Sequence, residues 1–196
     1  MKIIGITGSV AMGKSSTVKM LRYLGYPVFD ADAEVAKLYA QDTDFIEEVM
    51  IYFPEAVDLA GRLDKVLLAQ RVFSDNSARK TLEGLIHPRV WHASEQFTRK
   101  HQRLRTRFVF WDVPLLFQSR MQHSCDEIWV VSASEFLQRR RALRRKGWDE
   151  QRFEAIRAIQ LPPFVQERMA DRLIATGLGK AHTLRCLKQY ISGCFT

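Results

Sequence analysis

Cysteine is scarce in this chain of 196 residues, with only Cys125, Cys186 and Cys194 present. An odd number of cysteines without C-x-x-C spacing is typical of reduced thiols in a reducing compartment, and it argues against a disulfide framework or a cysteine-based zinc site. The five histidines are scattered, and the closest pair, His87 and His92, is five residues apart, which does not place both on one helical face. We therefore expect no disulfides and no structural metal site.

Long apolar runs are also lacking. No stretch approaches the roughly 20 consecutive apolar residues that a membrane span needs. The apolar run at residues 3–6 is too short for a secretory signal. Hydrophobic residues make up 46% and charged residues 27%, which is ordinary globular usage and argues against a disordered or fibrous protein. We expect a soluble protein in the cytoplasm with no membrane contact.

The charge balance is basic, with 30 Lys and Arg against 22 Asp and Glu, a formal net charge of +8. Such a balance attracts phosphates of any kind, so nucleic acids and small phosphorylated ligands are both compatible with it. No aromatic-glycine motif of an RNA-recognition domain is present, and we expect no nucleic-acid partner. No strong heptad seam appears either, so a monomer is the default expectation.

The apolar pattern predicts an α/β fold built around short buried strands. A strand at residues 2–7, a loop at 8–13, a helix at 15–24 and a strand at 27–29 form a βαβ unit. Helical spacing then dominates residues 33–107, with interruptions expected at Pro54, Gly61 and Pro88. The elements expected further along the chain are strands at 108–112, 127–132 and 172–175, helices from about 134 with a break at Pro162 and Pro163, and a C-terminal helix at 180–190.

Residues 8–15, GSVAMGKS, match the pattern G-x-x-x-x-G-K-[ST] between the first strand and the first helix. Glycines let such a loop wrap so that its N–H groups point at phosphate oxygens, and the following helix N-terminus adds positive potential. In this pattern Lys14 reaches the β- and γ-phosphates and the Ser15 hydroxyl ligates Mg²⁺. The motif therefore predicts a site for a nucleoside triphosphate and magnesium.

Aspartates follow two of the predicted strands. Asp30 and Asp32 close the second strand, where a carboxylate can face the phosphates and accept a proton from an attacking hydroxyl. A solvated strand end or a helix cap explains them equally well from position alone. Asp112 closes the third strand, where it can hold Mg²⁺ directly or through water, or simply cap the turn before Pro114.

Six of the eight residues from 139 to 146 are basic. On a helix Arg141 and Arg145 share a face, because they are four residues apart. That face can clamp triphosphate charge from a closing lid. A solvated helix surface and an RNA-binding face are the alternative interpretations.

Together these motifs resemble the dephospho-CoA kinase family. The resemblance implies a P-loop, three-layer α/β/α fold with a parallel sheet, a helical acceptor-binding insertion and a basic lid helix in one kinase domain. The expected parts are a core at about 1–32, 108–133 and 170–196, the insertion at about 33–107 and the lid at about 134–160. The matching residues are 8–15, Asp30 and Asp32, His87-Pro88, 112–117 and Ala170-Asp171.

The resemblance also implies roles for individual residues. Asp32 would be the base for the ribose 3′-hydroxyl of dephospho-CoA, Lys14 and Arg141 would complete the catalytic set, and Arg141 would neutralise the transferring phosphoryl group. Mg²⁺ would be held by Ser15, and Asp112 stays the candidate ligand, direct or through water, that its place at the strand end suggests. The residues implied for ATP are Gly8, Ala11, Met12, Gly13, Lys14, Ser15, Ser16 and Arg145. Those implied for the acceptor are Asp32, His87, Leu115, Leu116, Phe117 and Arg141.

Several positions depart from what is usual in that family, namely Ser9, Ala11, Met12, Gln118, Gln166 and Thr176. Gln138 and Gln160, in contrast, match family positions in the lid helix and after it. Two other functions stay open at this level. One is a kinase of the same fold that acts on another small hydroxyl acceptor, such as a nucleotide or nucleoside. The other is a catalytically degenerate P-loop protein that only binds.

Overall fold

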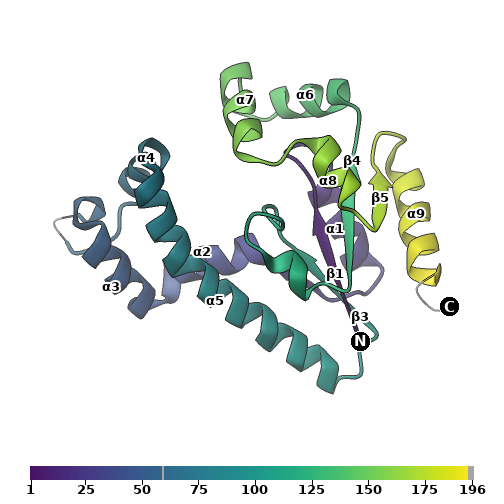
Figure 1. Ribbon diagram of the computed structural model, residues 1–196, viewed down its shortest axis with the longest axis horizontal. Helices are drawn as coiled ribbons and strands as arrows, with labels where there is room; N and C mark the ends of the chain where they lie inside the picture. The colour runs from purple at the N-terminus through teal and green to yellow at the C-terminus, as the bar shows by residue number, and fades with distance from the viewer. Residues whose placement is uncertain (59, 194–196) are drawn as a thin grey trace. The chain divides into compact units, whose positions relative to one another are not determined.

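The computed structural model describes residues 1–58 and 60–193 (Figure 1). It contains a five-stranded sheet in the order β2-β3-β1-β4-β5. Every neighbouring pair of strands is parallel. The predicted strands are confirmed, with the second displaced by one residue. Their bounds are β1 (Lys2–Thr7), β2 (Val28–Asp30), β3 (Phe108–Asp112), β4 (Glu127–Ser132) and β5 (Arg172–Ala175).

Helices account for most of the remaining described chain. No helix within residues 1–58 and 60–193 is long and apolar enough to cross a membrane. The α-helices are α1 (Lys14–Tyr23), α2 (Ala31–Gln41), α3 (Thr43–Tyr52), α4 (Lys65–Ser74), α5 (Asn76–Arg103), α6 (Glu135–Leu143), α7 (Glu150–Ile159), α8 (Pro163–Arg168) and α9 (Lys180–Gly193). Two short 3₁₀ helices are η1 (Pro54–Ala56) and η2 (Met121–Ser124).

The chain divides into two compact units. The first, called the sheet unit below, comprises Met1–Asp30 and the chain from Phe97 onward. The second, called the helical unit, is Ala31–Gln96. The boundary at Asp30 is the last residue of β2, and the boundary at Phe97 lies inside the long helix α5.

The sheet unit is layered because its strands alternate side chains between two faces. On one face, Ile4 and Phe110 pack in a buried cluster that also contains Leu21 of α1 and Leu187 of α9. On the other face the indole N–H of Trp111 donates to Thr98 Oγ1 at 3.2 Å, from the C-terminal part of α5. Helices therefore cover both faces of the sheet, which is the arrangement that all-parallel sheets require.

The helical unit has its own apolar core. α3 begins at an N-cap, Asp42, whose side chain accepts from Phe45 N at 2.9 Å. Phe45 and Val49 are one turn apart on α3, and both are fully buried. They share a cluster with Leu68 of α4 and Leu82 of α5. This core gives the unit an apolar interior that does not depend on the sheet.

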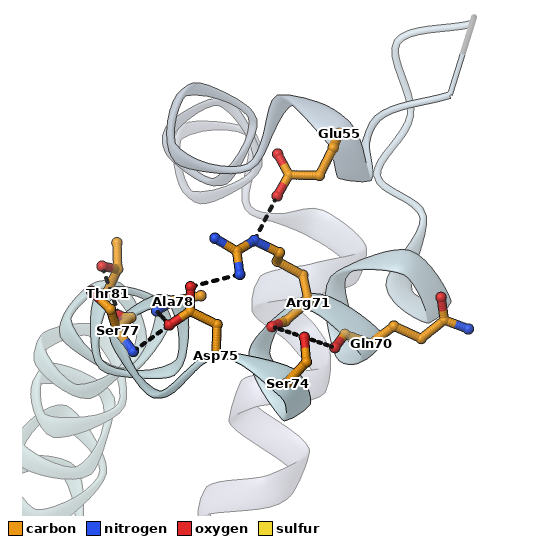
Figure 2. A network of polar contacts seen from close by, with 8 residues as sticks. All are labelled: Glu55, Gln70, Arg71, Ser74, Asp75, Ser77, Ala78 and Thr81. Atoms are coloured by element: carbon orange, nitrogen blue, oxygen red, sulfur yellow. Dashed lines mark hydrogen bonds and ion pairs between the residues drawn. The ribbon is translucent and has the colours of Figure 1, made fainter.

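A polar junction joins the end of α4 to the start of α5 (Figure 2). Arg71 donates to Glu55 of η1 at 3.2 Å and to Asp75 at 2.6 Å. The other oxygen of Asp75 accepts from the backbone N–H groups of Ser77 and Ala78, as an N-cap does. The hydrogen bond from Arg71, with these backbone bonds, holds the pKa of Asp75 below its usual value.

Pro88 does not interrupt a helix, so that prediction was wrong. It lies inside α5, which runs unbroken from Asn76 to Arg103. A proline in a helix leaves the carbonyl four residues earlier, here that of Gly84, without its usual N–H partner. Both residues are exposed, so water can hydrate that carbonyl, and the helix continues through the proline.

Candidate active site

The loop between β1 and α1 needs glycine at its two ends. Gly8 and Gly13 have φ values of 149° and 105°. A Cβ built on Gly8 would lie 2.4 Å from Cγ2 of Val131, so no side chain fits there. Ala11 also adopts a positive φ of 60°, and Met12 N donates to Ser9 O at 3.2 Å. The loop is thus a tight turn that leads directly into α1.

The start of α1 supplies positive potential. The first N–H groups of a helix have no partner within that helix, and the helix dipole places partial positive charge there. Lys14 and Ser15 are the first two residues of α1, and Gly13 is its N-cap residue. The arrangement matches the known physics of phosphate sites at helix N-termini.

Lys14 forms an ion pair with Asp112 at the carboxyl end of β3. Asp112 is 7% exposed, and burial raises the pKa of its carboxyl above the usual range, while the neighbouring Lys14 ammonium acts in the opposite direction. Asp30 is the register partner of Asp112 on β2, and its charge also raises that pKa. Two carboxylates and one ammonium therefore gather at one edge of the sheet.

The oxygen donors at this edge suit magnesium. Ser15 offers an exposed hydroxyl, and Asp112 offers a carboxylate beside the loop lysine. Mg²⁺ takes hard oxygen ligands and is usually held by one or two carboxylates together with substrate phosphates and water. Within residues 1–58 and 60–193, no group of three or more His, Cys, Asp or Glu is placed to hold a metal ion.

Arg141 of α6 reaches the loop directly. Its Nη1 donates to Thr176 Oγ1 at 2.9 Å and to Met12 O at 3.4 Å, and its Nη2 donates to Thr176 O at 2.8 Å. The Thr176 hydroxyl also contacts Met12 O, and its Oγ1 would lie 2.9 Å from a Cβ on Gly13. The Thr176 hydroxyl therefore hydrogen-bonds to the backbone of Met12, and both positions depart from the family pattern.

Arg145 does not share a helical face with Arg141, contrary to expectation. α6 ends at Leu143, so Arg145 lies in the turn beyond it. Its guanidinium stacks on the Trp148 ring at 4.8 Å from the centroid. Periodicity alone did not show where this basic helix stops.

The expected acceptor residues Asp32 and His87 both belong to the helical unit. Asp32 does not close the second strand as expected, since β2 ends at Asp30 and Asp32 lies in the first turn of α2. Its side chain is exposed, and a negative charge in a first turn is favourable to the helix. His87 is exposed on α5, next to Pro88.

The segment after β3 divides between core and surface. Leu116 is fully buried, and its Cδ2 would lie 2.9 Å from a Cβ on Gly5. Phe117 is also buried, at 8% exposure, whereas Leu115 is partly exposed. In this conformation only Leu115 of the three presents appreciable surface to a ligand.

Several polar residues that contact the loop were not assigned a role from the sequence. Thr176 is one, and Gln166 is another, because its Nε2 donates to Ser9 Oγ at 2.9 Å. Gln138 and Gln160 also reach the loop backbone. Residues so distant along the chain carry no local pattern that indicates such a contact.

The family model for dephospho-CoA kinase matches residues 2–179. This chain belongs to the dephospho-CoA kinase family. Among curated proteins, the dephospho-CoA kinase of Paramagnetospirillum magneticum is 46% identical over 162 residues, which are 83% of this chain and 76% of that protein. That of Rhodospirillum rubrum is 40% identical over 186 residues, 95% of this chain and 88% of that protein.

Solved structures share the fold of this chain. The TT1252 protein of Thermus thermophilus has a TM-score of 0.87 and 32% identity, covering 100% of this chain and 98% of that one. A shikimate kinase from Acinetobacter baumannii has a TM-score of 0.52 at 15% identity, covering 98% of this chain and 94% of its own, a likeness of fold alone. The predicted P-loop kinase fold is confirmed.

Proposed function

We propose how this chain carries out the reaction of its family, the ATP-dependent phosphorylation of dephospho-CoA to coenzyme A. The ribose 3′-oxygen of dephospho-CoA bonds to the γ-phosphorus of ATP, and the bond to the bridging oxygen breaks. ADP leaves with the electron pair, and the hydroxyl proton goes to a protein base. The observation that supports this proposal is the glycine loop at the start of α1, with Lys14 paired to a buried aspartate.

The loop and Lys14 bind the triphosphate. Loop amides and the first N–H groups of α1 hold phosphate oxygens, and Gly8, Ala11, Met12, Gly13 and Ser16 shape or line that cradle. Lys14 exchanges part of its contact with Asp112 for the β- and γ-phosphates, because phosphate oxygens compete for its ammonium. Catalysis follows mainly from position and charge neutralisation, as in other phosphoryl transfers.

Ser15 and Asp112 would hold Mg²⁺, which when bound neutralises phosphate charge. The buried Asp112 carboxylate keeps a fixed direction because Lys14 bonds to it. Arg141 donates toward Met12 and Thr176 at the loop, and from there its guanidinium neutralises the transferring phosphoryl group. Arg145 contributes further positive charge to the nucleotide from the turn after α6.

Asp32 accepts the proton from the ribose 3′-hydroxyl. Its carboxylate is exposed in the first turn of α2, so it can meet a substrate hydroxyl without first leaving a core. His87 and Leu115 contact the acceptor, and the buried Leu116 and Phe117 anchor the segment that carries Leu115. We propose further that the enzyme is cytoplasmic and monomeric.

Coenzyme A formation from MgATP and dephospho-CoA, measured by mass spectrometry, tests this function. Asp32→Asn should lower turnover by about 10²-fold or more, the usual contribution of a general base, and should still bind ATP. Lys14→Ala should abolish turnover. Asp44→Asn is a matched control, since Asp44 is an exposed acid in the first turn of the next helix.

Each outcome addresses a separate part of the proposal. No coenzyme A from the wild type would refute the acceptor, and a panel of other hydroxyl acceptors would follow. Wild-type turnover in Asp32→Asn would refute the base, and wild-type turnover in Lys14→Ala would refute the loop as the ATP site.

A further inference from the structure

Both backbone polar groups of Val10, in the middle of the loop, are bound by glutamine side chains. The N–H of Val10 donates to Gln160 Oε1 at 2.8 Å. Its carbonyl accepts from Gln138 Nε2 at 2.9 Å. Gln138 lies on α6, and Gln160 directly follows α7. The two peptide units that flank Val10 are therefore each held by a segment that lies about 130 or 150 residues away along the chain.

The chemistry of the backbone determines how each amide is oriented. A backbone N–H can only donate and a carbonyl can only accept, so Gln160 must present its oxygen and Gln138 its nitrogen. The two backbone groups of Val10 therefore require opposite hydrogen-bonding atoms from the two glutamines. Gln160 is needed as an acceptor and Gln138 as a donor.

Gln138 is fully buried, and its Oε1 has no hydrogen-bond partner within the part of the chain that the structure describes. A buried polar atom without a partner is destabilising, so an apolar side chain would suit the site better for packing alone. The amide of Gln138 does donate a hydrogen bond to the Val10 carbonyl, which an apolar side chain could not do.

The loop needs such support from outside. Ala11, the next residue, has a φ of 60°, a conformation that residues with a Cβ disfavour. The orientation of the Val10 peptide groups constrains the turn that leads through Ala11 to Gly13 and the start of α1. If Val10 rotated, the amides that follow it would no longer converge on a phosphate.

We infer that Gln138 and Gln160 are positioning residues that hold the loop in its phosphate-binding shape. This inference depends on the proposed function, because it takes the loop as the ATP site. Neither glutamine needs to touch substrate. They act on ATP only through the backbone of Val10.

Two isosteric substitutions with opposite predictions test it. Gln160→Glu keeps an acceptor for the Val10 N–H, so its KM for ATP should stay within about twofold of wild type. Gln138→Glu removes the donor and places carboxylate oxygens against a carbonyl. Its KM for ATP should rise about 3- to 10-fold, the range that a lost hydrogen bond produces, with an unchanged KM for dephospho-CoA. Gln151→Glu, at an exposed position of α7, is the control for the added charge.

A second variant covers the case in which a buried glutamate prevents folding. Gln138→Met has a similar volume and no charge, and it should also raise the KM for ATP with the melting temperature close to wild type. Hydrogen exchange of the loop peptide should be faster in Gln138→Met than in Gln151→Glu. A wild-type KM for ATP in Gln138→Met, or equal rises in Gln138→Glu and Gln160→Glu, would overturn the inference.

The same experiment separates this inference from the proposed function. Lys14→Ala is assayed beside the glutamine variants. If Lys14→Ala retains wild-type turnover, the loop is not the ATP site and the proposed function fails. If Lys14→Ala is inactive while Gln138→Met behaves as wild type, only the positioning role fails.

Discussion

At the scale of single residues, two opposing effects act on the ionisation of Asp112. Burial disfavours its ionised form and raises its pKa, whereas the ion pair with Lys14 and the proposed binding of Mg²⁺ both need a charged carboxylate. The ionised Asp112 side chain therefore contributes less to the stability of the folded protein than a neutral side chain of the same shape would. Buried ionisable groups with shifted pKa values are common in active sites, which is the role proposed for Asp112.

Asp112→Asn tests this balance. The pKa of Asp112 is higher in the folded protein than in the unfolded chain, where it is about 3.9. As the pH rises from below the unfolded pKa through the folded pKa, ionisation of Asp112 therefore makes the wild type less stable. The asparagine variant lacks that decline, so its stability relative to the wild type should increase between pH 3.5 and pH 7. Turnover should fall by about 10²-fold.

Urea unfolding at several pH values, with turnover measured alongside, provides the comparison. The difference between the two proteins reports on Asp112 and the charges that it contacts, because the rest of the sequence is the same in both. A stability difference that does not vary with pH would contradict the raised pKa.

At the scale of elements, the junction between α4 and α5 depends on one aspartate with two functions. Asp75 caps the start of α5 with one oxygen and binds Arg71 with the other (Figure 2). Capping gives α5 a defined first turn, and the ion pair connects that turn to η1 through Glu55. The long helix that carries His87 and Pro88 thus begins at a defined point.

Asp75→Asn should keep the cap and lose the ion pair. The pKa of Asp75 is lowered in the folded protein, chiefly by the hydrogen bond from Arg71. The stability that the Asp75 carboxylate contributes is therefore present above the pKa of the unfolded chain and is lost as the pH falls through the folded pKa. We expect the melting temperature at pH 7 to drop by about 1–3 °C. The difference from wild type should vanish at a pH low enough to protonate Asp75.

Glu83→Gln is the matched control for this prediction. Glu83 is 3.8 Å from Arg79 in an exposed i,i+4 pair of α5 and has no part in the cap. Its replacement should change the melting temperature less than Asp75→Asn does. A pH-independent effect of Asp75→Asn, measured by thermal unfolding, would mean that the ion pair with Arg71 contributes nothing.

At the scale of the whole molecule, each of the two compact units has an apolar core of its own. The sheet unit is built around Ile4, Phe110 and Trp129, and the helical unit around Phe45 and Leu82. Each unit buries its own large side chains, so local opening of one need not open the other. The residues proposed for ATP lie in the sheet unit, and Asp32 and His87 lie in the helical unit.

Phe45→Ala should destabilise the helical unit selectively. Phe45 is fully buried, and removing a buried phenyl ring costs about 3–5 kcal/mol. Hydrogen exchange should become faster in residues 31–96 and change little in the sheet unit. Phe73→Ala is the control, because Phe73 is 77% exposed in the same unit and should change stability by about 0.5 kcal/mol or less. Equal acceleration in both units would contradict separate cores.

Much of the fold was predictable because its signals are local. A buried parallel strand appears as a short apolar run, so β3 and β4 matched their predicted bounds. The loop was recognisable because phosphate binding requires glycine and lysine at set intervals. The position of Asp32 in α2 and the end of α6 at Leu143 were not predictable, since helix boundaries depend on capping and packing as well as on periodicity.

The sequence by itself determined the α/β class, the strands, the glycine loop and the resemblance to dephospho-CoA kinases, because each depends on residues close together in the chain. Only the tertiary structure decided which distant side chains complete the loop. Thr176 meets Met12 and Arg141, and Gln138 and Gln160 meet Val10. The contacts to Val10 and Met12 join residues more than a hundred positions apart, Thr176 and Arg141 are 35 apart, and no local periodicity encodes any of them. They form because the chain brings α6, the end of α7 and the end of β5 to the loop.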